Sequence, residues 1–195
     1  MKGITEKEML FVLSIFKSPE KEYSASSIAS ILNISRMGAL KIARKLEKEE
    51  IIGSKIIGKS KIYFLNAAKD YTKHYLRMLL GREAEKAQPY IKVWINEIKK
   101  IKNAEAAILF GSILRKKEAN DIDVIFIVKQ NKFEELKKEI EKVNKLNIKK
   151  IHPVYQSEND FKKNLYRYDK LVIGAIKGIF VVGENKLIDI ILKNE

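Results

Sequence analysis

The sequence predicts an α/β (α+β) chain with two folded parts joined by a helix. Residues 1–66 show three short helical patterns followed by a β-hairpin pattern, residues 67–88 one long helical pattern, and residues 89–195 strands alternating with helices. The chain of 195 residues is long enough for one or two hydrophobic cores. We therefore expect one domain over 1–66, a helical connector over 67–88 and a second domain over 89–195.

The composition excludes several classes of protein. With 46% hydrophobic and 33% charged residues, the chain is typical of a globular protein and not of a disordered one. No apolar run approaches the roughly 18 residues of a membrane helix, and Glu6 and Glu8 interrupt the apolar N-terminal stretch, unlike a signal peptide. The absence of Cys excludes disulfides, thiolate zinc sites and a cysteine nucleophile. We expect a cytoplasmic protein without a membrane partner.

The charge favours a polyanionic partner. The formal net charge is +14, and a lysine-rich surface of the kind found in hyperthermophile proteins is an alternative explanation. The distribution separates the two explanations, since residues 51–82 carry seven Lys and Arg against one acidic residue, whereas residues 105–195 carry 18 basic and 14 acidic residues. Excess charge therefore lies in the first half of the chain, as a nucleic-acid partner would require.

The first domain has the element order of a winged helix-turn-helix. Thr5 and Glu8 form a capping-box pattern, Ser24 and Ser35 can cap two further helices, and Gly58-Lys59-Ser60 is a hairpin turn signal. Two helices, a tight turn, a third helix and a hairpin within about 65 residues are typical of this fold. The expected helices cover residues 6–17, 25–32 and 35–49, and the expected strands 51–57 and 61–65.

This domain is expected to bind double-stranded DNA. Its third helix begins with small residues, which lets it enter a major groove, and the hairpin, or wing, is basic. Winged helices also serve protein contacts and dimerisation, but the basic third helix and wing favour DNA and a role in transcription regulation. The candidate DNA-contacting residues are Arg36, Lys41, Arg44, Lys45, Lys55, Lys59 and Lys61.

The second domain follows a helix over residues 90–102, which carries one apolar stripe. Together with the helix over 67–88, this helix is where we expect a homodimer to form. Beyond it, strands and helices alternate. The expected strands are 106–110, 122–128, 148–155 and 179–182, and the expected helices are 133–146, 160–166, 171–177 and 186–192.

One motif in this domain carries chemistry. A buried strand runs into Gly111-Ser112, and after eight further residues Asp121 and Asp123 open a second buried strand. Residues two apart in a strand face the same side, so the two carboxylates project together. Paired carboxylates suit Mg²⁺, a hard cation that prefers oxygen ligands and retains substrate phosphates as further ligands.

This motif resembles that of the nucleotidyltransferase superfamily of DNA polymerase β in its minimal form, over about residues 89–195. The resemblance implies a small nucleotidyltransferase-like mixed-sheet α/β domain that uses Mg²⁺ and a nucleoside triphosphate (NTP). It implies catalytic and metal-binding roles for Asp121 and Asp123. It also implies nucleotide binding by Gly111, which lets the backbone approach a triphosphate, and by Ser112, which offers its hydroxyl and amide to phosphate oxygens.

The sequence departs from the family pattern in two places. The family's third carboxylate is missing from residues 149–155, where His152 stands, and Glu158 and Asp160 come too late to replace it. In the family, a basic residue followed by a glycine commonly comes after Gly-Ser. Here the basic residue is Arg115, and Lys116 stands in place of the glycine. His152 can act as a base or ligand, although a lone His beside a Pro is more often structural.

Three functions are consistent with these features. The first is a DNA-binding regulator whose nucleotidyltransferase-like domain binds nucleotide and metal, or a partner. The second is an active Mg²⁺-dependent nucleotidyltransferase that moves NMP from an NTP to a hydroxyl of a protein, an RNA or a small molecule; minimal members of the superfamily act as antitoxins that modify a partner toxin. The third is a scaffold built on the long helices of residues 67–102.

Overall fold

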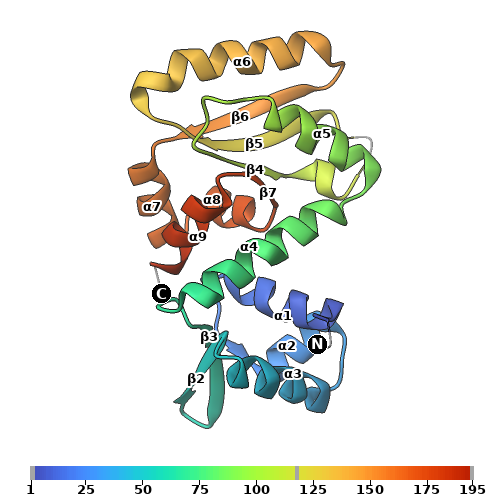
Figure 1. The fold of residues 1–195 in the computed structure, drawn as a ribbon, viewed down its shortest axis with the longest axis vertical. Coiled ribbons are helices and arrows are strands. Elements are labelled where there is room, and N and C mark those ends of the chain that lie inside the picture. The colour runs from blue at the N-terminus through green and yellow to red at the C-terminus, as the bar shows by residue number, and fades with distance from the viewer. Residues whose placement is uncertain (1–2, 117–118, 194–195) are drawn as a thin grey trace. The chain divides into compact units, whose positions relative to one another are not determined.

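The computed structural model describes residues 3–116 and 119–193, and the chain divides into two compact units (Figure 1). Among the described residues, one unit comprises residues 3–79 with Ile191–Lys193, and the other comprises residues 80–116 and 119–190. The division falls inside helix α4 (Asp70–Glu85), which is shorter than the helix predicted over 67–88. Among the described helices, none is long and apolar enough to cross a membrane.

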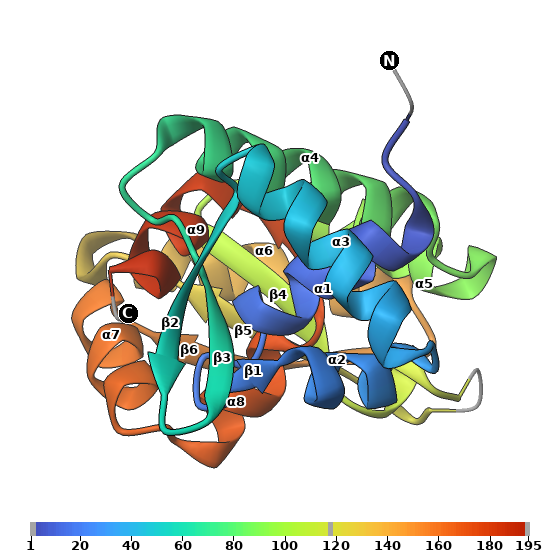
Figure 2. The same ribbon diagram turned by 90° about the horizontal axis from the view of Figure 1, so that it is seen from below.

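The first unit is a winged helix-turn-helix (Figure 2). Its antiparallel sheet has the order β1-β3-β2, and the β2–β3 hairpin forms the wing. Its elements before α4 are α1 (Glu6–Phe16), β1 (Tyr23–Ser24), α2 (Ala25–Leu32), α3 (Arg36–Lys48), β2 (Ile52–Ile57) and β3 (Ser60–Leu65).

Side-chain caps start the three helices where the sequence predicted them. The hydroxyls of Thr5, Ser24 and Ser35 each accept a hydrogen bond from a backbone N–H in the first turn, and Thr5 and Glu8 complete a capping box. The wing turn is one residue shorter than predicted, because Ile57 pairs with Ser60 and only two residues form the turn. Strand β1 was not predicted, since two residues are too few to show a periodic pattern.

The core of this unit determines which side of α3 faces solvent. Ala39, Ala43 and Leu46 are fully buried, and they lie on one side of the helix at a spacing of three to four residues. The rest of the core comes from the other helices and the sheet. Its largest fully buried side chains include Phe11, Phe16, Ile28, Ile52 and Leu65.

The second unit contains a four-stranded mixed sheet of order β6-β5-β4-β7. Strand β4 is antiparallel to β5 and β7, whereas β5 and β6 are parallel. The elements are α5 (Pro89–Lys99), β4 (Ala106–Phe110), the 3₁₀ turn η1 (Ser112–Leu114), β5 (Asp121–Ile127), the 3₁₀ turn η2 (Gln130–Lys132), α6 (Phe133–Leu146), β6 (Lys150–Gln156), α7 (Glu158–Tyr166), α8 (Lys170–Ile176), β7 (Ile179–Val182) and α9 (Glu184–Leu192).

Helices cover both faces of this sheet (Figure 1). On one face, Trp94 and Ile98 of α5 and Leu136 of α6 pack in one cluster with Val124 and Phe126 of β5. Helices α7 and α8 lie on the opposite side. From Ile122 onward β5 is buried apart from the half-buried Asp123, which fits a strand that pairs on both edges and is covered on both faces.

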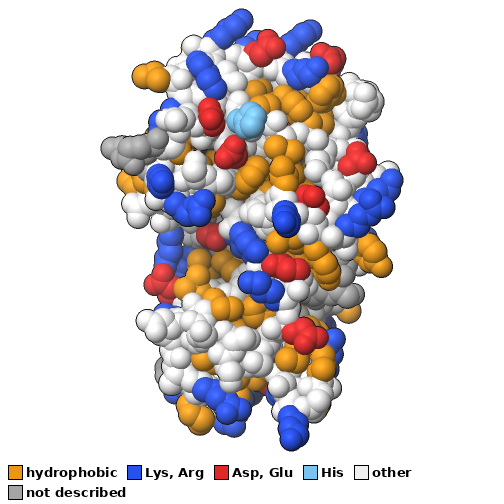
Figure 3. All heavy atoms as spheres, turned by 180° about the vertical axis from the view of Figure 1, so that it is seen from behind, with side chains coloured by type: hydrophobic (Ala, Val, Ile, Leu, Met, Phe, Trp, Pro, Cys, Tyr) orange, Lys and Arg blue, Asp and Glu red, His pale blue; other side chains and the backbone are white. Residues whose placement is uncertain are grey.

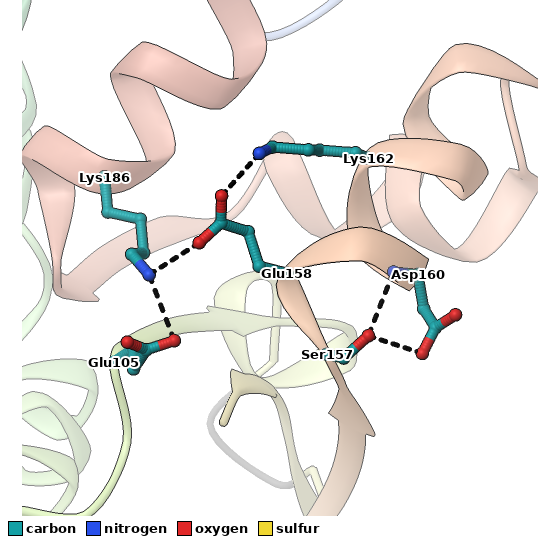
Figure 4. Close-up of polar contacts among 6 residues, drawn as sticks. All are labelled: Glu105, Ser157, Glu158, Asp160, Lys162 and Lys186. Atoms are coloured by element: carbon teal, nitrogen blue, oxygen red, sulfur yellow. Dashed lines mark hydrogen bonds and ion pairs between the residues drawn. The ribbon is translucent and has the colours of Figure 1, made fainter. Parts of the chain in front are cut away.

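An ion-pair network joins the start of β4 to α7 and α9 (Figure 4). Lys186 Nζ lies 3.0 Å from a carboxylate oxygen of Glu105 and 2.7 Å from one of Glu158. Glu158 also accepts a hydrogen bond from Lys162, one turn along α7. The hydrogen bond from Lys162, and then that from Lys186, lower the pKa of Glu158 from its ordinary value of 4.5 to about 2.

We expect Glu158→Gln to lower the free energy of unfolding at pH 7 by about 1 kcal/mol, a figure reduced for the solvent exposure of the pairs. A carboxylate with a depressed pKa in the folded state stabilises the protein fully above its unfolded pKa. That contribution is lost as the pH falls from 4.5 toward about 2. Urea unfolding between pH 2 and pH 7 should show this loss in the wild type and not in the variant.

The matched control is Glu134→Gln, which breaks a single exposed pair with Lys137 on α6. It should change stability by less than about 0.5 kcal/mol. Parallel pH profiles for the wild type and Glu158→Gln would contradict the network's role.

Candidate functional site

The two acidic residues of the motif open β5 at the edge of the core. Ile122 and Val124 are fully buried in the cluster under α5 and α6, so the alternating Asp121 and Asp123 project from the opposite face. Asp121 is exposed and Asp123 is half-buried. Asp121 belongs to the strand, which begins one residue earlier than predicted, because its backbone pairs with that of Lys150.

Gly111 brings the backbone against the Asp123 carboxylate. Antiparallel pairing places Phe110 opposite Asp123, and Gly111 follows with a φ of +84°. A Cβ at this position would lie 2.1 Å from Asp123 Oδ2, so only glycine fits both the space and the backbone conformation. The next residue, Ser112, is half-buried and begins η1, while Arg115 and Lys116 beyond that turn are exposed.

His152 stands beside Asp123 on the neighbouring strand. The parallel register pairs the two residues, and His152 Nδ1 lies 3.3 Å from Asp123 Oδ1. A carboxylate can only accept, so this hydrogen bond requires the proton on Nδ1. The His152 side chain is 73% exposed. An imidazole therefore lies beside Asp123, on the strand where the family resemblance led us to expect a third carboxylate.

The described residues contain no group of three or more His, Asp or Glu side chains able to hold a metal ion. Glu158 does not complete the set. The ladder partner of Asp123 is His152, and Glu158 follows six residues later, beyond Gln156 at the end of β6. The four residues from His152 to the strand end at Gln156 alone span about 13 Å. Asp121 and Asp123 thus provide two carboxylates, with an imidazole beside one of them.

The candidate DNA surface lies on α3 and the wing. Arg36, Lys41 and Arg44 of α3 and Lys55 and Lys59 of the wing are exposed, and none of the five forms an ion pair within 4.0 Å among the described residues. Figure 3 shows Lys and Arg side chains at the lower edge of this unit, with hydrophobic side chains among them.

The other two candidates, Lys45 and Lys61, are held by carboxylates of their own unit. Lys45 Nζ lies 2.7 Å from an oxygen of Glu8, and Lys61 Nζ lies 2.7 Å from an oxygen of Glu47, which also accepts from Ser54. Burial raises the pKa of Glu8, but the hydrogen bonds from Lys45 and Thr5 outweigh it and leave this pKa below its ordinary value. Burial also raises the pKa of Glu47, and the hydrogen bonds from Lys61 and Ser54 outweigh this effect, so its pKa lies below the ordinary value.

Sequence reasoning missed Glu8 and Glu47 as partners of these lysines. Glu8 was identified only as part of a helix cap, and it lies 37 residues before Lys45. Glu47 lies 14 residues before Lys61. No local spacing rule predicts pairs so far apart in the chain.

Residues 93–176 match the family model described as "Polymerase beta, Nucleotidyltransferase". The match covers Gly111, Asp121, Asp123 and His152. No curated protein matches the chain.

Two solved structures are similar to about half of the chain. The adhesin competence repressor AdcR from Streptococcus pyogenes is 13% identical, with 52% of this chain and 70% of that chain covered and a TM-score of 0.38. A mutant of ZitR from Lactococcus lactis is 15% identical, with 52% and 64% covered and a TM-score of 0.36. The element order and the β1-β3-β2 sheet of the first unit are those of a winged helix.

We expect Gly111→Ala to destabilise the protein by about 1–3 kcal/mol, because the new methyl group would meet the Asp123 carboxylate and the backbone would be strained. Chemical denaturation measures this change. Gly174→Ala in α8 is the matched control, since nothing lies within 4 Å of a Cβ there. In a helix this change should stabilise by about 0.5–1 kcal/mol. Equal stability of the two variants would contradict the close approach.

Proposed function

We propose that the protein is a DNA-binding transcription regulator whose second unit binds a nucleotide together with a divalent metal ion. The observation that carries the first part is the set of five exposed cations on α3 and the wing that form no ion pair among the described residues. A homodimer through residues 67–102 and a cytoplasmic location remain predictions of the sequence.

Helix α3 has the dimensions and the chemistry to read duplex DNA. It spans 13 residues, and a helix is about 10–12 Å wide with its side chains, which matches a major groove about 12 Å wide. Arg36, Lys41 and Arg44 are exposed and can reach phosphates or base edges. Lys55 and Lys59 sit on the wing, where they can contact the adjacent phosphates.

Lys45 and Lys61 have a different role in this proposal. Each neutralises a carboxylate that lies at least partly buried, and removing either cation would leave that charge unpaired. They hold α3 to α1 and the wing to α3, and so support the surface that carries the other five cations.

The proposed ligand of the second unit is a nucleotide. Asp121 and Asp123 supply oxygen donors, and Mg²⁺ is commonly bound by one or two carboxylates together with substrate phosphates. These two carboxylates thus fit an ion whose other ligands are nucleotide phosphates. They do not fit an ion held by three protein side chains, since the described residues contain no such group. When bound, such an ion neutralises phosphate charge. Ser112 and the exposed Arg115 and Lys116 would contact the phosphates.

We expect Lys55→Gln/Lys59→Gln to weaken binding of a labelled DNA duplex at low salt. The variant should also flatten the plot of log K against log salt by up to about 1.8, because each phosphate contact contributes about 0.9 to the slope. Fluorescence anisotropy between about 50 and 300 mM NaCl measures both quantities.

Lys138→Gln/Lys142→Gln on α6 makes the same change in net charge and serves as the control. It should leave the slope unchanged. Lys61→Met should lower stability, by up to about 1 kcal/mol, with little change in slope. Equal slopes for the wing variant and the α6 variant would contradict DNA binding by the wing.

Active nucleotidyl transfer is the second candidate, and the close approach of Gly111 to Asp123 favours it. In that reaction an acceptor hydroxyl oxygen, of a protein or another molecule, attacks the α-phosphorus of an NTP. The bond from that phosphorus to the bridging oxygen breaks, pyrophosphate leaves and the hydroxyl proton passes to water. Transfer of labelled NMP that Asp121→Ala/Asp123→Ala abolishes would establish this activity.

We expect His152→Asp to tighten Mn²⁺ binding by about tenfold or more, because it adds a third carboxylate beside Asp123 and raises the ligand charge. Titration of free Mn²⁺ by electron paramagnetic resonance measures the affinity without any turnover. Asp123→Asn/His152→Asp should lose the gain. Tight Mn²⁺ binding by the wild type that His152→Asp does not improve would show that the natural donor set is complete.

A further inference from the structure

The junction between α7 and α8 carries an exposed surface that neither proposed activity uses. Two tyrosines flank an arginine there, and Tyr166 is 75% and Tyr168 54% exposed. In the part of the chain that the structure describes, neither ring stacks on another ring and neither hydroxyl forms a hydrogen bond. We define the Tyr–Arg patch as Lys163, Tyr166, Arg167, Tyr168 and Lys170.

Tyr168 occupies a backbone position that normally selects glycine. Helix α7 ends in a Schellman motif, in which the N–H of Tyr168 donates to Leu165 O at 3.0 Å and that of Asp169 to Asn164 O at 2.9 Å. This motif places Tyr168 in the left-handed region, with a φ of +53°. A bulky side chain is rare there because its Cβ crowds the backbone. The Tyr168 ring is 54% exposed, so its packing does not offset the backbone strain and does not explain why a tyrosine stands here.

The charge around these rings is positive. Residues 161–171 contain four Lys or Arg and one acid, Asp169. The Asp169 carboxylate caps α8 by accepting hydrogen bonds from the N–H groups of Leu171 and Val172, at 3.0 and 3.1 Å. Lys163, Arg167 and Lys170 are exposed, and none of them forms an ion pair with another described residue. Lys163 and Arg167 are one turn apart and so share a side of α7.

We propose that the Tyr–Arg patch binds single-stranded nucleic acid. Exposed aromatic rings stack with unpaired bases, whereas a base-paired duplex hides its base faces from them. The neighbouring cations supply contacts to the phosphates, and Arg167 can also stack through its guanidinium plane. An acidic protein segment would use the cations but would give the two solvent-exposed rings no comparable partner.

The test is the binding of a labelled 12-nucleotide oligo(dT), which cannot form base pairs with itself, to the full chain. Tyr166→Ala and Tyr168→Gly should each weaken binding by about fivefold or more, as expected for the loss of one stacked base. Tyr168→Gly should at the same time raise the melting temperature by about 2–4 °C, since glycine adopts the left-handed conformation without strain. Weaker binding by a more stable protein cannot come from misfolding.

Two variants are matched controls. Tyr71→Ala removes another exposed tyrosine, on α4, and should leave oligo(dT) binding unchanged. Lys55→Gln/Lys59→Gln should weaken duplex binding and leave oligo(dT) binding unchanged. The oligo(dT) assay therefore tests the patch and the duplex assay tests the wing, so a result that contradicts one proposal leaves the other standing.

Three results would overturn the proposal. The first is an oligo(dT) affinity that Tyr166→Ala/Tyr168→Gly does not change. The second is a wild-type protein that does not bind oligo(dT) at about 50 mM salt. The third is tyrosine-dependent binding of polyglutamate in place of oligo(dT), which would identify the patch as a surface for acidic proteins.

Discussion

The pairing of β5 on both edges is the constraint on which the second unit depends. Its residues from Ile122 onward are buried between two layers of helices, apart from the half-buried Asp123. Polar side chains can therefore reach solvent only at the start of the strand, where Asp121 and Asp123 lie. Antiparallel pairing with β4 brings Gly111 against the same carboxylate, and parallel pairing with β6 brings His152 beside it. One strand thus assembles residues from three separate parts of the chain.

The local signals in the sequence predicted much of this arrangement. Apolar runs predicted both β4 and β5, and hydroxyl caps predicted where α1, α2 and α3 begin, because these features depend on neighbouring residues. The partner of Asp123 depends on strand register instead. His152 lies 29 residues away, and its position opposite Asp123 follows from the pairing of whole strands. The sequence could predict that a carboxylate was missing, but not that an imidazole would form a hydrogen bond to the remaining one.

Long-range ion pairs also limit what can be concluded from charge alone. Counting cations treated all seven candidates on α3 and the wing alike. The fold divides them, because Glu8 and Glu47 each hold one lysine and leave five cations without such a partner among the described residues. A buried carboxylate such as Glu8 requires its counter-ion, so Lys45 contributes to the fold before it contributes to any surface potential. Net charge therefore indicates that a surface is basic and does not identify the residues free to bind.

Three helix ends in the described chain place a residue other than glycine in the left-handed region, and a comparison of them isolates Tyr168. Asn33 follows α2, and asparagine tolerates this conformation. Glu50 follows α3, and its carboxylate forms an exposed ion pair with Lys69 at 3.2 Å within the same unit. Tyr168 has neither an intrinsic preference for the conformation nor a side-chain contact of that kind among the described residues. The strain at Tyr168 therefore requires a reason outside the fold, and an exposed ring beside Arg167 supplies one if its partner is a base.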